Sequence, residues 1–288
     1  MNLGKDLPNS RRDLIKWMRI KLKEYNIRLK SRLSQILLTD PKVLRFIAKK
    51  ASELVSNRRS AVIIEIGAGI GNLTQFLVHE NINALIVAVE IDHRFAPILQ
   101  EIKKTYSNVE VLIGDAIPLL TSMRGVDLAA GNIPYHITSN LLLALAHSSI
   151  PCALLTVQKD VAERIVSKPG TKNYGKLSIL MQMMFDVDVL RVIPSTLFVP
   201  PPRVSSAIIV LKRKNEYNQY VESIEYLTKC LFSYKRKLVS KALTYCLDKK
   251  LDNRIEVEGD IWRKRVGQLT VEDLMKLVDM YADLKKRN

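Results

Sequence analysis

The chain has 288 residues, with 45 Lys or Arg against 29 Asp or Glu, and so a formal net charge of +16. The length suits one large α/β domain plus a smaller one, and the charge favours association with a polyanion such as nucleic acid, although a solubilising surface would carry the same charge. No apolar run reaches the roughly 20 residues of a membrane-spanning helix, and the N-terminus lacks the apolar core of a signal peptide, so we expect no membrane contact.

The first thirty residues form a basic extension. Basic and apolar side chains alternate in it, among them Arg11, Lys16, Arg19, Lys23, Leu14 and Met18. The pattern predicts a short basic helix. This helix is either an RNA-binding arm or a solvated extension, and both interpretations stay open.

From residue 61 onward, β-branched runs alternate with amphipathic stretches. Strands are expected at residues 61–66, 84–89, 109–113, 126–130 and 152–157, and a later pair at 187–192 and 205–211. Helices are expected at residues 72–79, 94–104, from about 139, and at 160–166. Strands separated by helices predict a doubly wound parallel sheet, with the late pair as an antiparallel edge.

The strand pattern stops after residue 214, and residues 220–284 read as helices only. We therefore expect an extension at 1–30, an α/β domain at 31–214 and a helical domain at 215–288.

The three cysteines, Cys152, Cys230 and Cys246, are widely spaced and odd in number. They indicate neither a disulfide framework nor a zinc site, so we expect no metal and a reducing cytoplasm.

Three features at the ends of expected strands predict a nucleoside-binding crevice. Residues 67–71 read Gly-Ala-Gly-Ile-Gly between a strand and a helix, where a ligand can approach the backbone closely. Glu90 ends the second strand and could accept from ribose hydroxyls, and Asp115 follows the third and could accept from an adenine amino group. Each acid alone is equally well explained as a helix cap or loop residue. The carboxyl ends of parallel strands lie at one edge of the sheet, however, so the three features together outline a nucleoside-binding crevice.

The run Asn132-Ile133-Pro134-Tyr135 follows the fourth expected strand at the same edge. An exocyclic adenine amine is a poor nucleophile because its lone pair is delocalised into the ring. The Asn132 amide oxygen and a backbone carbonyl fixed by Pro134 could accept both amino hydrogens, and Tyr135 offers a face for an unstacked base. Such a run alone is also a common turn, and we interpret His136 as a structural neighbour rather than a base.

Together these residues resemble the KsgA-type small-subunit ribosomal RNA adenine dimethyltransferases, over roughly residues 30–284. Further segments are similar to that family's motifs: F-x-P-x-P-x-V-x-S at 198–206, K-x-Y-G-x-L-S at 172–178, F-x-x-[RK]-R-K at 232–237 and the closing helix entry at 268–274. One motif departs, because the family's L-G-Q-[NH]-F-L reads Leu33-Ser34-Gln35-Ile36-Leu37-Leu38 here. If the cofactor uses backbone groups at position 36, little is lost, whereas use of the side chain would weaken binding.

The resemblance implies a Rossmann-like class I methyltransferase sheet that uses S-adenosylmethionine, and a small C-terminal α-helical domain that binds RNA. The implied catalytic residues are Asn132, Pro134, Tyr135 and Phe198, with the target adenine stacked between Tyr135 and Phe198. The implied cofactor contacts are Gln35, Ile36, Leu38, Gly67, Gly69, Glu90, Ile91, Asp115, Ala116 and Asn132.

The resemblance also implies a substrate, namely two adjacent adenines near the 3′ end of small-subunit rRNA in a pre-ribosomal subunit, methylated by a cytoplasmic monomer. Two alternatives stay open: a large-subunit rRNA methyltransferase of the antibiotic-resistance type, and a non-catalytic RNA- or DNA-binding factor on the same scaffold. A nicotinamide dehydrogenase shares the glycine-rich turn, but the sequence lacks its catalytic constellation. RNA contacts are expected from the basic extension and from residues 212–214 and 235–237.

Overall fold

The structure is a computed structural model that describes residues 7–30, 35–246 and 260–286, the last four of them for their backbone only. The chain divides into two compact units, one of residues 1–162 and 188–213, the other of residues 163–187 and 214–288. Among the described residues, no helix is both long and apolar enough to cross a membrane.

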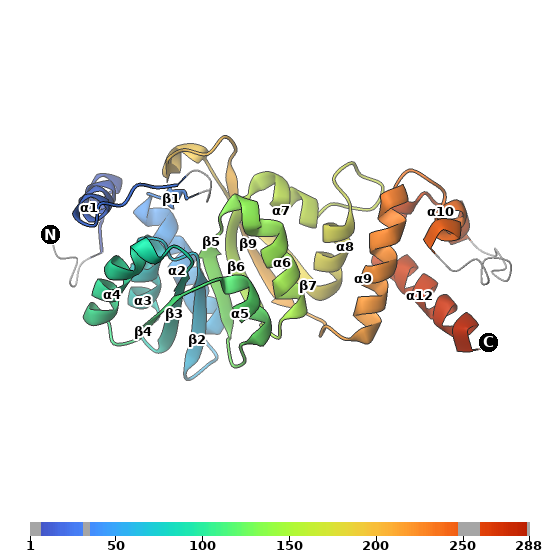
Figure 1. The fold of residues 1–288 in the computed structure, drawn as a ribbon, viewed down its shortest axis with the longest axis horizontal. Helices are drawn as coiled ribbons and strands as arrows, with labels where there is room; N and C mark the ends of the chain where they lie inside the picture. Colours follow the sequence, from blue (N-terminus) through green and yellow to red (C-terminus); the bar gives the residue numbers. More distant parts are fainter. Residues whose placement is uncertain (1–6, 31–34, 247–259, 287–288) are drawn as a thin grey trace. The chain divides into compact units, whose positions relative to one another are not determined.

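A seven-stranded sheet forms the centre of the first unit (Figure 1). Its order is β4-β3-β2-β5-β6-β9-β7; the pairs from β4 to β6 are parallel, and β9 is antiparallel to β6. The strands are β2 Ala61–Ile66, β3 Ala84–Glu90, β4 Val109–Ile113, β5 Leu128–Asn132, β6 Cys152–Gln158, β7 Phe185–Ile193 and β9 Ser206–Arg213. The expected class I sheet is confirmed, and β5 reaches Asn132, so this residue ends the strand.

Helices flank this sheet (Figure 1). Ile63 and Ile64 point to opposite faces of β2 and both are buried, so both faces of the sheet are covered. The helices are α2 Pro41–Val55, α3 Asn72–Glu80, α4 Ala96–Thr105, α5 Ala116–Ser122, α6 Thr138–His147 and α7 Lys159–Ile165. The order of the strands reverses at β2, which lies between β3 and β5. In such sheets ligands bind beyond the carboxyl ends of the strands at the reversal.

A second sheet of two short strands, β1 and β8, brings together segments far apart in the sequence. In β1 (Leu37–Leu38) Leu37 pairs with Val199 and Leu38 with Phe198, the two residues of β8 (Phe198–Val199). The strands are antiparallel. This pairing holds residues 35–38 beside the main sheet.

The basic extension contains the helix α1, Arg11–Glu24, which begins at the Ser10 cap. Its apolar face is buried in the core of the first unit through Leu14, Trp17 and Met18. Arg11 Nε donates to Thr39 Oγ1 at 3.0 Å, and Lys21 pairs with Glu101 at 2.6 Å. The helix is therefore a docked part of the first unit.

The second unit contains α8 Lys176–Met184, α9 Gln219–Leu231, α10 Val239–Cys246 and α12 Val271–Lys286. It includes residues 163–187 as well as the C-terminal part that the sequence marks as helical. Cys230 at the end of α9 and Cys246 at the end of α10 form a disulfide. This corrects the expectation of no disulfide: packing of α10 on α9 brings the two Cα atoms to 5.7 Å, which a spacing of 16 residues does not signal.

Candidate functional site

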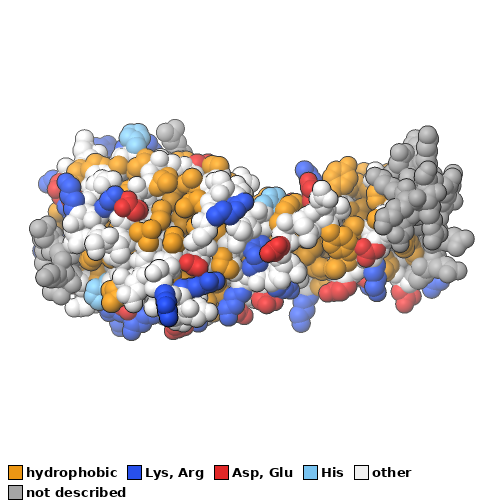
Figure 2. All heavy atoms as spheres, turned by 90° about the horizontal axis from the view of Figure 1, so that it is seen from below, with side chains coloured by type: hydrophobic (Ala, Val, Ile, Leu, Met, Phe, Trp, Pro, Cys, Tyr) orange, Lys and Arg blue, Asp and Glu red, His pale blue; other side chains and the backbone are white. Residues whose placement is uncertain are grey.

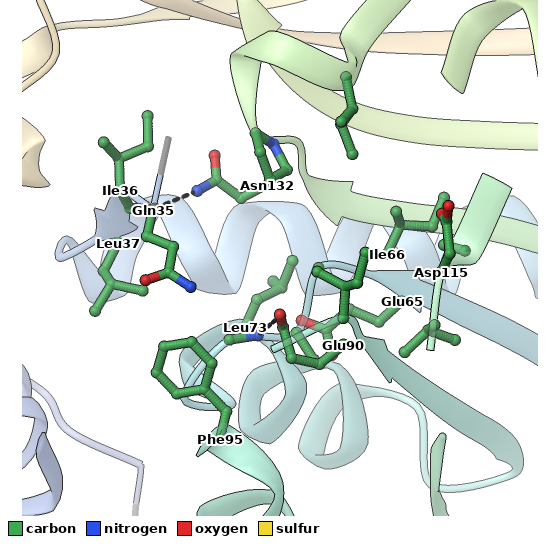
Figure 3. A pocket seen from close by; sticks show the side chains of 18 of the residues that line it. Gln35, Ile36, Leu37, Glu65, Ile66, Leu73, Glu90, Phe95, Asp115 and Asn132 are labelled. Carbon is green, nitrogen blue, oxygen red and sulfur yellow. Dashed lines mark hydrogen bonds between the residues drawn. The ribbon is translucent and has the colours of Figure 1, made fainter. Parts of the chain in front are cut away.

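A pocket lies where the chain leaves the carboxyl ends of β2, β3 and β5 (Figure 3). Residues far apart in sequence line it, as the strand order requires. All but one of the predicted cofactor contacts are among them: Gln35, Ile36, Gly67, Gly69, Glu90, Ile91, Asp115, Ala116 and Asn132. Pro134 and His136 also line the pocket.

The glycine-rich turn forms its floor. Gly67 and Gly69 have φ values of 71° and 58°, which side chains rarely adopt, and so a substitution at either would strain the turn. A Cβ at Gly67 would lie 3.5 Å from Pro134 Cδ, which shows how closely the turn approaches residues after β5. Because neither glycine carries a side chain, a ligand in the pocket can approach the backbone here.

Acidic side chains stand at the ends of two neighbouring strands. Glu90 is buried, and its two oxygens accept from the backbone N–H groups of Gly69 at 2.7 Å and Asp92 at 2.8 Å. Burial raises the pKa of Glu90, and these hydrogen bonds oppose the rise. Asp115 Oδ1 caps α5 through the N–H of Ile117 while its carboxylate lines the pocket, so it is both a helix cap and a pocket residue. Carboxylate oxygens have further lone pairs for ligand hydroxyl or amino groups.

Of the two polar atoms in the Asn132 amide, only the nitrogen makes a hydrogen bond among the described residues. Its Nδ2 donates to the carbonyl oxygen of Ile36 at 3.1 Å, as Figure 3 shows. Its Oδ1 is buried and has no hydrogen-bond partner within the described residues. The amide is thereby oriented with an acceptor left over, at a position that lines the pocket. The Ile36 backbone carries this contact, so the departure from the family's side chain at position 36 leaves it in place.

Comparison with known proteins identifies the family and the fold. The family model described as "Ribosomal RNA adenine dimethylase" matches residues 26–283. The chain belongs to this family. A ribosomal RNA small subunit methyltransferase A from Thermotoga maritima is 36% identical over 260 residues, covering 90% of this chain and 88% of that protein. The family, the enzyme class and the cofactor predicted from the sequence, S-adenosylmethionine, are confirmed.

Two solved methyltransferase structures share the fold. A dimethyladenosine transferase from Plasmodium falciparum matches with a TM-score of 0.71 and 27% identity, covering 86% of this chain and 98% of that one. The 23S rRNA methyltransferase ErmE matches with a TM-score of 0.59 and 25% identity, covering 84% and 99%. The structural similarity thus extends along most of the present chain.

Three predicted dimethylase site residues lie elsewhere than expected. Leu38 is buried outside the pocket, where its carbonyl accepts from Asn72 Nδ2 at 2.7 Å. Phe198 is only 1% exposed, because β8 pairs it with Leu38 in the core, so in this arrangement it has no face for a base. Tyr135 is half-buried, does not line the pocket, and its hydroxyl contacts Ser206 Oγ at 2.7 Å.

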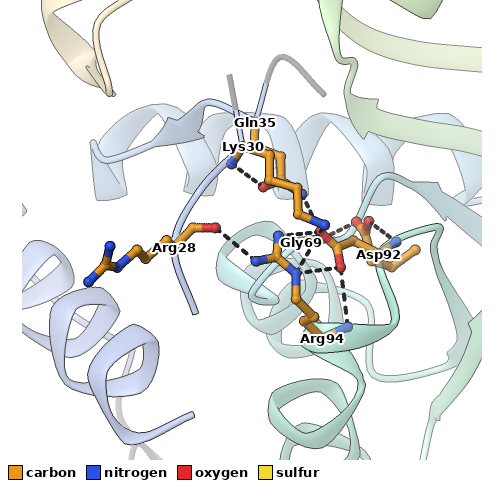
Figure 4. Close-up of polar contacts among 7 residues, drawn as sticks. Arg28, Lys30, Gln35, Gly69, Asp92 and Arg94 are labelled. Atoms are coloured by element: carbon orange, nitrogen blue, oxygen red, sulfur yellow. Dashed lines mark hydrogen bonds and ion pairs between the residues drawn. The ribbon is translucent and has the colours of Figure 1, made fainter. Parts of the chain in front are cut away.

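Polar contacts hold Arg28, Lys30 and Gln35 beside the pocket (Figure 4). Gln35 Nε2 donates to Asp92 Oδ2 at 2.9 Å, and Gln35 Oε1 accepts from the backbone N–H of Lys30 at 2.7 Å. Arg94 donates to Asp92 as well, and also to the carbonyl of Arg28 at 3.0 Å. Its hydrogen bond holds the pKa of Asp92 well below the ordinary value. The Gln35 amide therefore acts structurally while the residue lines the pocket.

Glu65 is a pocket residue that the sequence analysis missed. It is 1% exposed, and its Oε2 has no hydrogen-bond partner among the described residues. Burial raises its pKa to about 8, and the neighbouring charge of Glu90 adds to the rise. The signal that could have revealed it is a single acid inside an otherwise apolar strand. A carboxyl in this setting can receive a cationic group of a ligand.

This pKa makes folding stability depend on pH. Because the folded value of about 8 lies above the ordinary 4.5, the folded chain keeps a proton that the unfolded chain releases. The stability associated with Glu65 is full at low pH and falls as pH rises towards 8, by about 1.4 kcal/mol per unit. Denaturant unfolding across this range should show the decline, and Glu65→Gln should flatten it. An equal slope in the variant would assign the decline to other groups.

The basic runs predicted to contact RNA are partly used within the protein. Arg213 donates to backbone carbonyls at the end of α6, Lys235 Nζ to three carbonyls between residues 171 and 174, and Lys214 pairs with Asp186 at 3.6 Å. These contacts engage the three side chains within the protein, and their contact with RNA stays a prediction. The exposed cations of the two runs are Lys212, Lys214, Arg236 and Lys237. On the face in Figure 2, basic side chains are interspersed with acidic ones, so net charge alone does not mark an RNA surface.

Proposed function

We propose that this chain dimethylates the N6 amino groups of two adjacent adenines near the 3′ end of small-subunit rRNA, as a cytoplasmic monomer acting on a pre-ribosomal subunit. The observation that carries the proposal is the buried, unpartnered Oδ1 of Asn132 at the pocket, with the rest of its amide fixed on Ile36. An acceptor already oriented and desolvated can bind an amino hydrogen without reorganisation.

The pocket residues fit S-adenosylmethionine. Glu90 can accept from ribose hydroxyls and Asp115 from the adenine amino group of the cofactor. Glu65, whose Oε2 has no partner among the described residues, can receive its ammonium group. Gly67 and Gly69 line the pocket without side chains, so a ligand can approach the backbone there. When bound, this cofactor supplies an electrophilic methyl group together with its own leaving group.

The residues of the chain then act on the target amine. Asn132 Oδ1 and a backbone carbonyl at Pro134 accept its two hydrogens, which favours a pyramidal nitrogen whose lone pair can react. Holding the amine in line supplies most of the acceleration, and no strong base is needed because the proton can leave after transfer. Tyr135, anchored on Ser206, supports the base, whereas Phe198 would need to leave the core to stack on it. The helical second unit and residues 1–30 add RNA contacts.

Mapping of methylated nucleotides tests this proposal. Labelled methyl groups from S-adenosylmethionine should enter undermethylated small-subunit rRNA, with two methyl groups on each of two adjacent adenines by mass spectrometry. Methylation of large-subunit rRNA instead would assign the activity to the ErmE type, which the shared fold keeps as the second candidate. Absence of cofactor binding in a calorimetric titration would support a non-catalytic RNA-binding factor.

A further inference from the structure

The outward face of α1 carries a stripe of four cations, Arg12, Lys16, Arg19 and Lys23, all exposed. Their spacing of four, three and four residues places them within roughly 60° of one another around the helix, at about 100° per residue. The stripe runs for about 16 Å along the axis. The buried Leu14, Trp17 and Met18 lie on the opposite side. We call these four residues the α1 stripe.

The remaining cations of α1 serve to dock the helix. Arg11 donates to Thr39 Oγ1, and Lys21 pairs with Glu101 and Glu24. By contrast, no side chain of the α1 stripe makes an ion pair or hydrogen bond with any residue that the structure describes. The cations that dock the helix are therefore separate from the cations that face outward. A surface that serves only solubility does not require this separation.

The helix holds the α1 stripe in a fixed position next to the segment that lines the pocket. At one end Arg11 contacts Thr39, which follows β1 directly and donates to the carbonyl of Leu197 beside β8. At the other end Tyr25 hydrogen-bonds to Glu101 of α4. The family match begins at residue 26, so α1 lies outside the part of the chain that the family model describes.

We propose that the α1 stripe binds the phosphate backbone of the RNA substrate and extends the RNA-binding surface of the first unit outward from the pocket. This inference rests on the proposed function for the identity of the polyanion. Cations held on a rigid helix attract phosphates without reading bases, and each phosphate contact displaces counterions from the RNA. Ile15 and Ile20 flank the α1 stripe and line a groove together with Arg12, Lys16 and Arg19 of the stripe, which gives the RNA backbone an apolar edge.

The test compares two full-length quadruple variants that remove equal charge. One replaces the α1 stripe (R12Q, K16Q, R19Q and K23Q); the control replaces four other exposed cations of the first unit (K42Q, K49Q, R59Q and K104Q). Affinity for deproteinised small-subunit rRNA is measured against salt concentration. We expect the stripe variant to bind at least tenfold more weakly at low salt, with the slope of log affinity against log salt reduced by about 3, since each phosphate contact contributes about 0.7–0.9. The control should change much less.

Further measurements separate the possible causes. Cofactor affinity and thermal unfolding should match wild type in the stripe variant, and methyl transfer should show a raised KM for RNA with an unchanged kcat. An unchanged salt slope, or equal losses in both variants, would overturn the proposal. Lost affinity for whole small subunits with intact affinity for free rRNA would also overturn it, in favour of an acidic protein partner. If wild type binds rRNA through the α1 stripe but transfers no methyl group to it, the proposed function fails and the RNA contact stands.

Discussion

Replacing Asn132 by alanine is expected to lower kcat for methyl transfer about 10²–10³-fold while changing the affinity for S-adenosylmethionine less than about tenfold. The side chain supplies the buried, unpartnered Oδ1 that we assign to the target amine. Truncation removes this acceptor and replaces it with a space that water can enter. Single-turnover transfer of labelled methyl groups measures the loss, and calorimetry measures cofactor binding.

The matched control is Asn72→Ala. Asn72 also lines the pocket, and its Nδ2 donates to a backbone carbonyl of the same segment, that of Leu38. Both substitutions therefore loosen residues 36–38, but only Asn132→Ala removes the unpartnered acceptor. We expect Asn72→Ala to lower kcat less than about tenfold. Equal losses would show that Asn132 acts by holding this segment and would contradict its assigned role.

Gly131→Ala is expected to lower the free energy of unfolding by about 3 kcal/mol, a large loss for the addition of a single methyl group. A Cβ at this position would lie 2.5 Å from the carbonyl oxygen of Ile66 on the neighbouring strand and 3.0 Å from Ile133 Cδ1. The carbonyl belongs to the backbone of β2, which is fixed between β3 and β5 and cannot move aside cheaply. Denaturant unfolding measures the change.

Gly175→Ala provides the control for added bulk at a glycine. A Cβ there meets no atom within 4 Å, and its φ of −169° is open to any residue. We expect the free energy of unfolding to change by less than about 1 kcal/mol, since this residue only precedes α8.

Because Gly131 adjoins Asn132, the Gly131→Ala substitution should also weaken cofactor binding. A Gly131→Ala protein as stable as wild type would mean that β2 and β5 can separate locally.

The central strands were predictable because their residues carry the signal themselves. Residues 61–66 and 109–113 are rich in β-branched side chains, which favour strands, and strands occur there. The pairing of β1 with β8 was not predictable, because two-residue strands show no periodicity and their partner lies about 160 residues away. The docking of α1 likewise depends on which surface its apolar face meets.

The candidate site was predictable where chemistry and strand ends coincide, as at Glu90, Asp115 and Asn132. The site was not predictable where a residue of a motif packs or hydrogen-bonds within the protein instead of facing the pocket. Phe198 belongs to a long, specific motif, yet its ring packs in the core. Lys235 lies in a basic run, yet its amino group satisfies carbonyls of a loop. A motif records which residue is required, whereas only packing decides whether it faces a ligand.

The order of the strands also has a consequence for how the chain is synthesised. β9, at residues 206–213, lies between β6 and β7, and β8 closes over β1 near the pocket. A nascent chain that emerges N-terminal end first holds β2 to β6 well before the strand that joins β6 to β7 has left the ribosome. Such late, non-local pairing slows folding, so the pocket wall formed by residues 35–37 is completed only after more than two thirds of the chain exists. The enzyme therefore completes this pocket only late in its own translation.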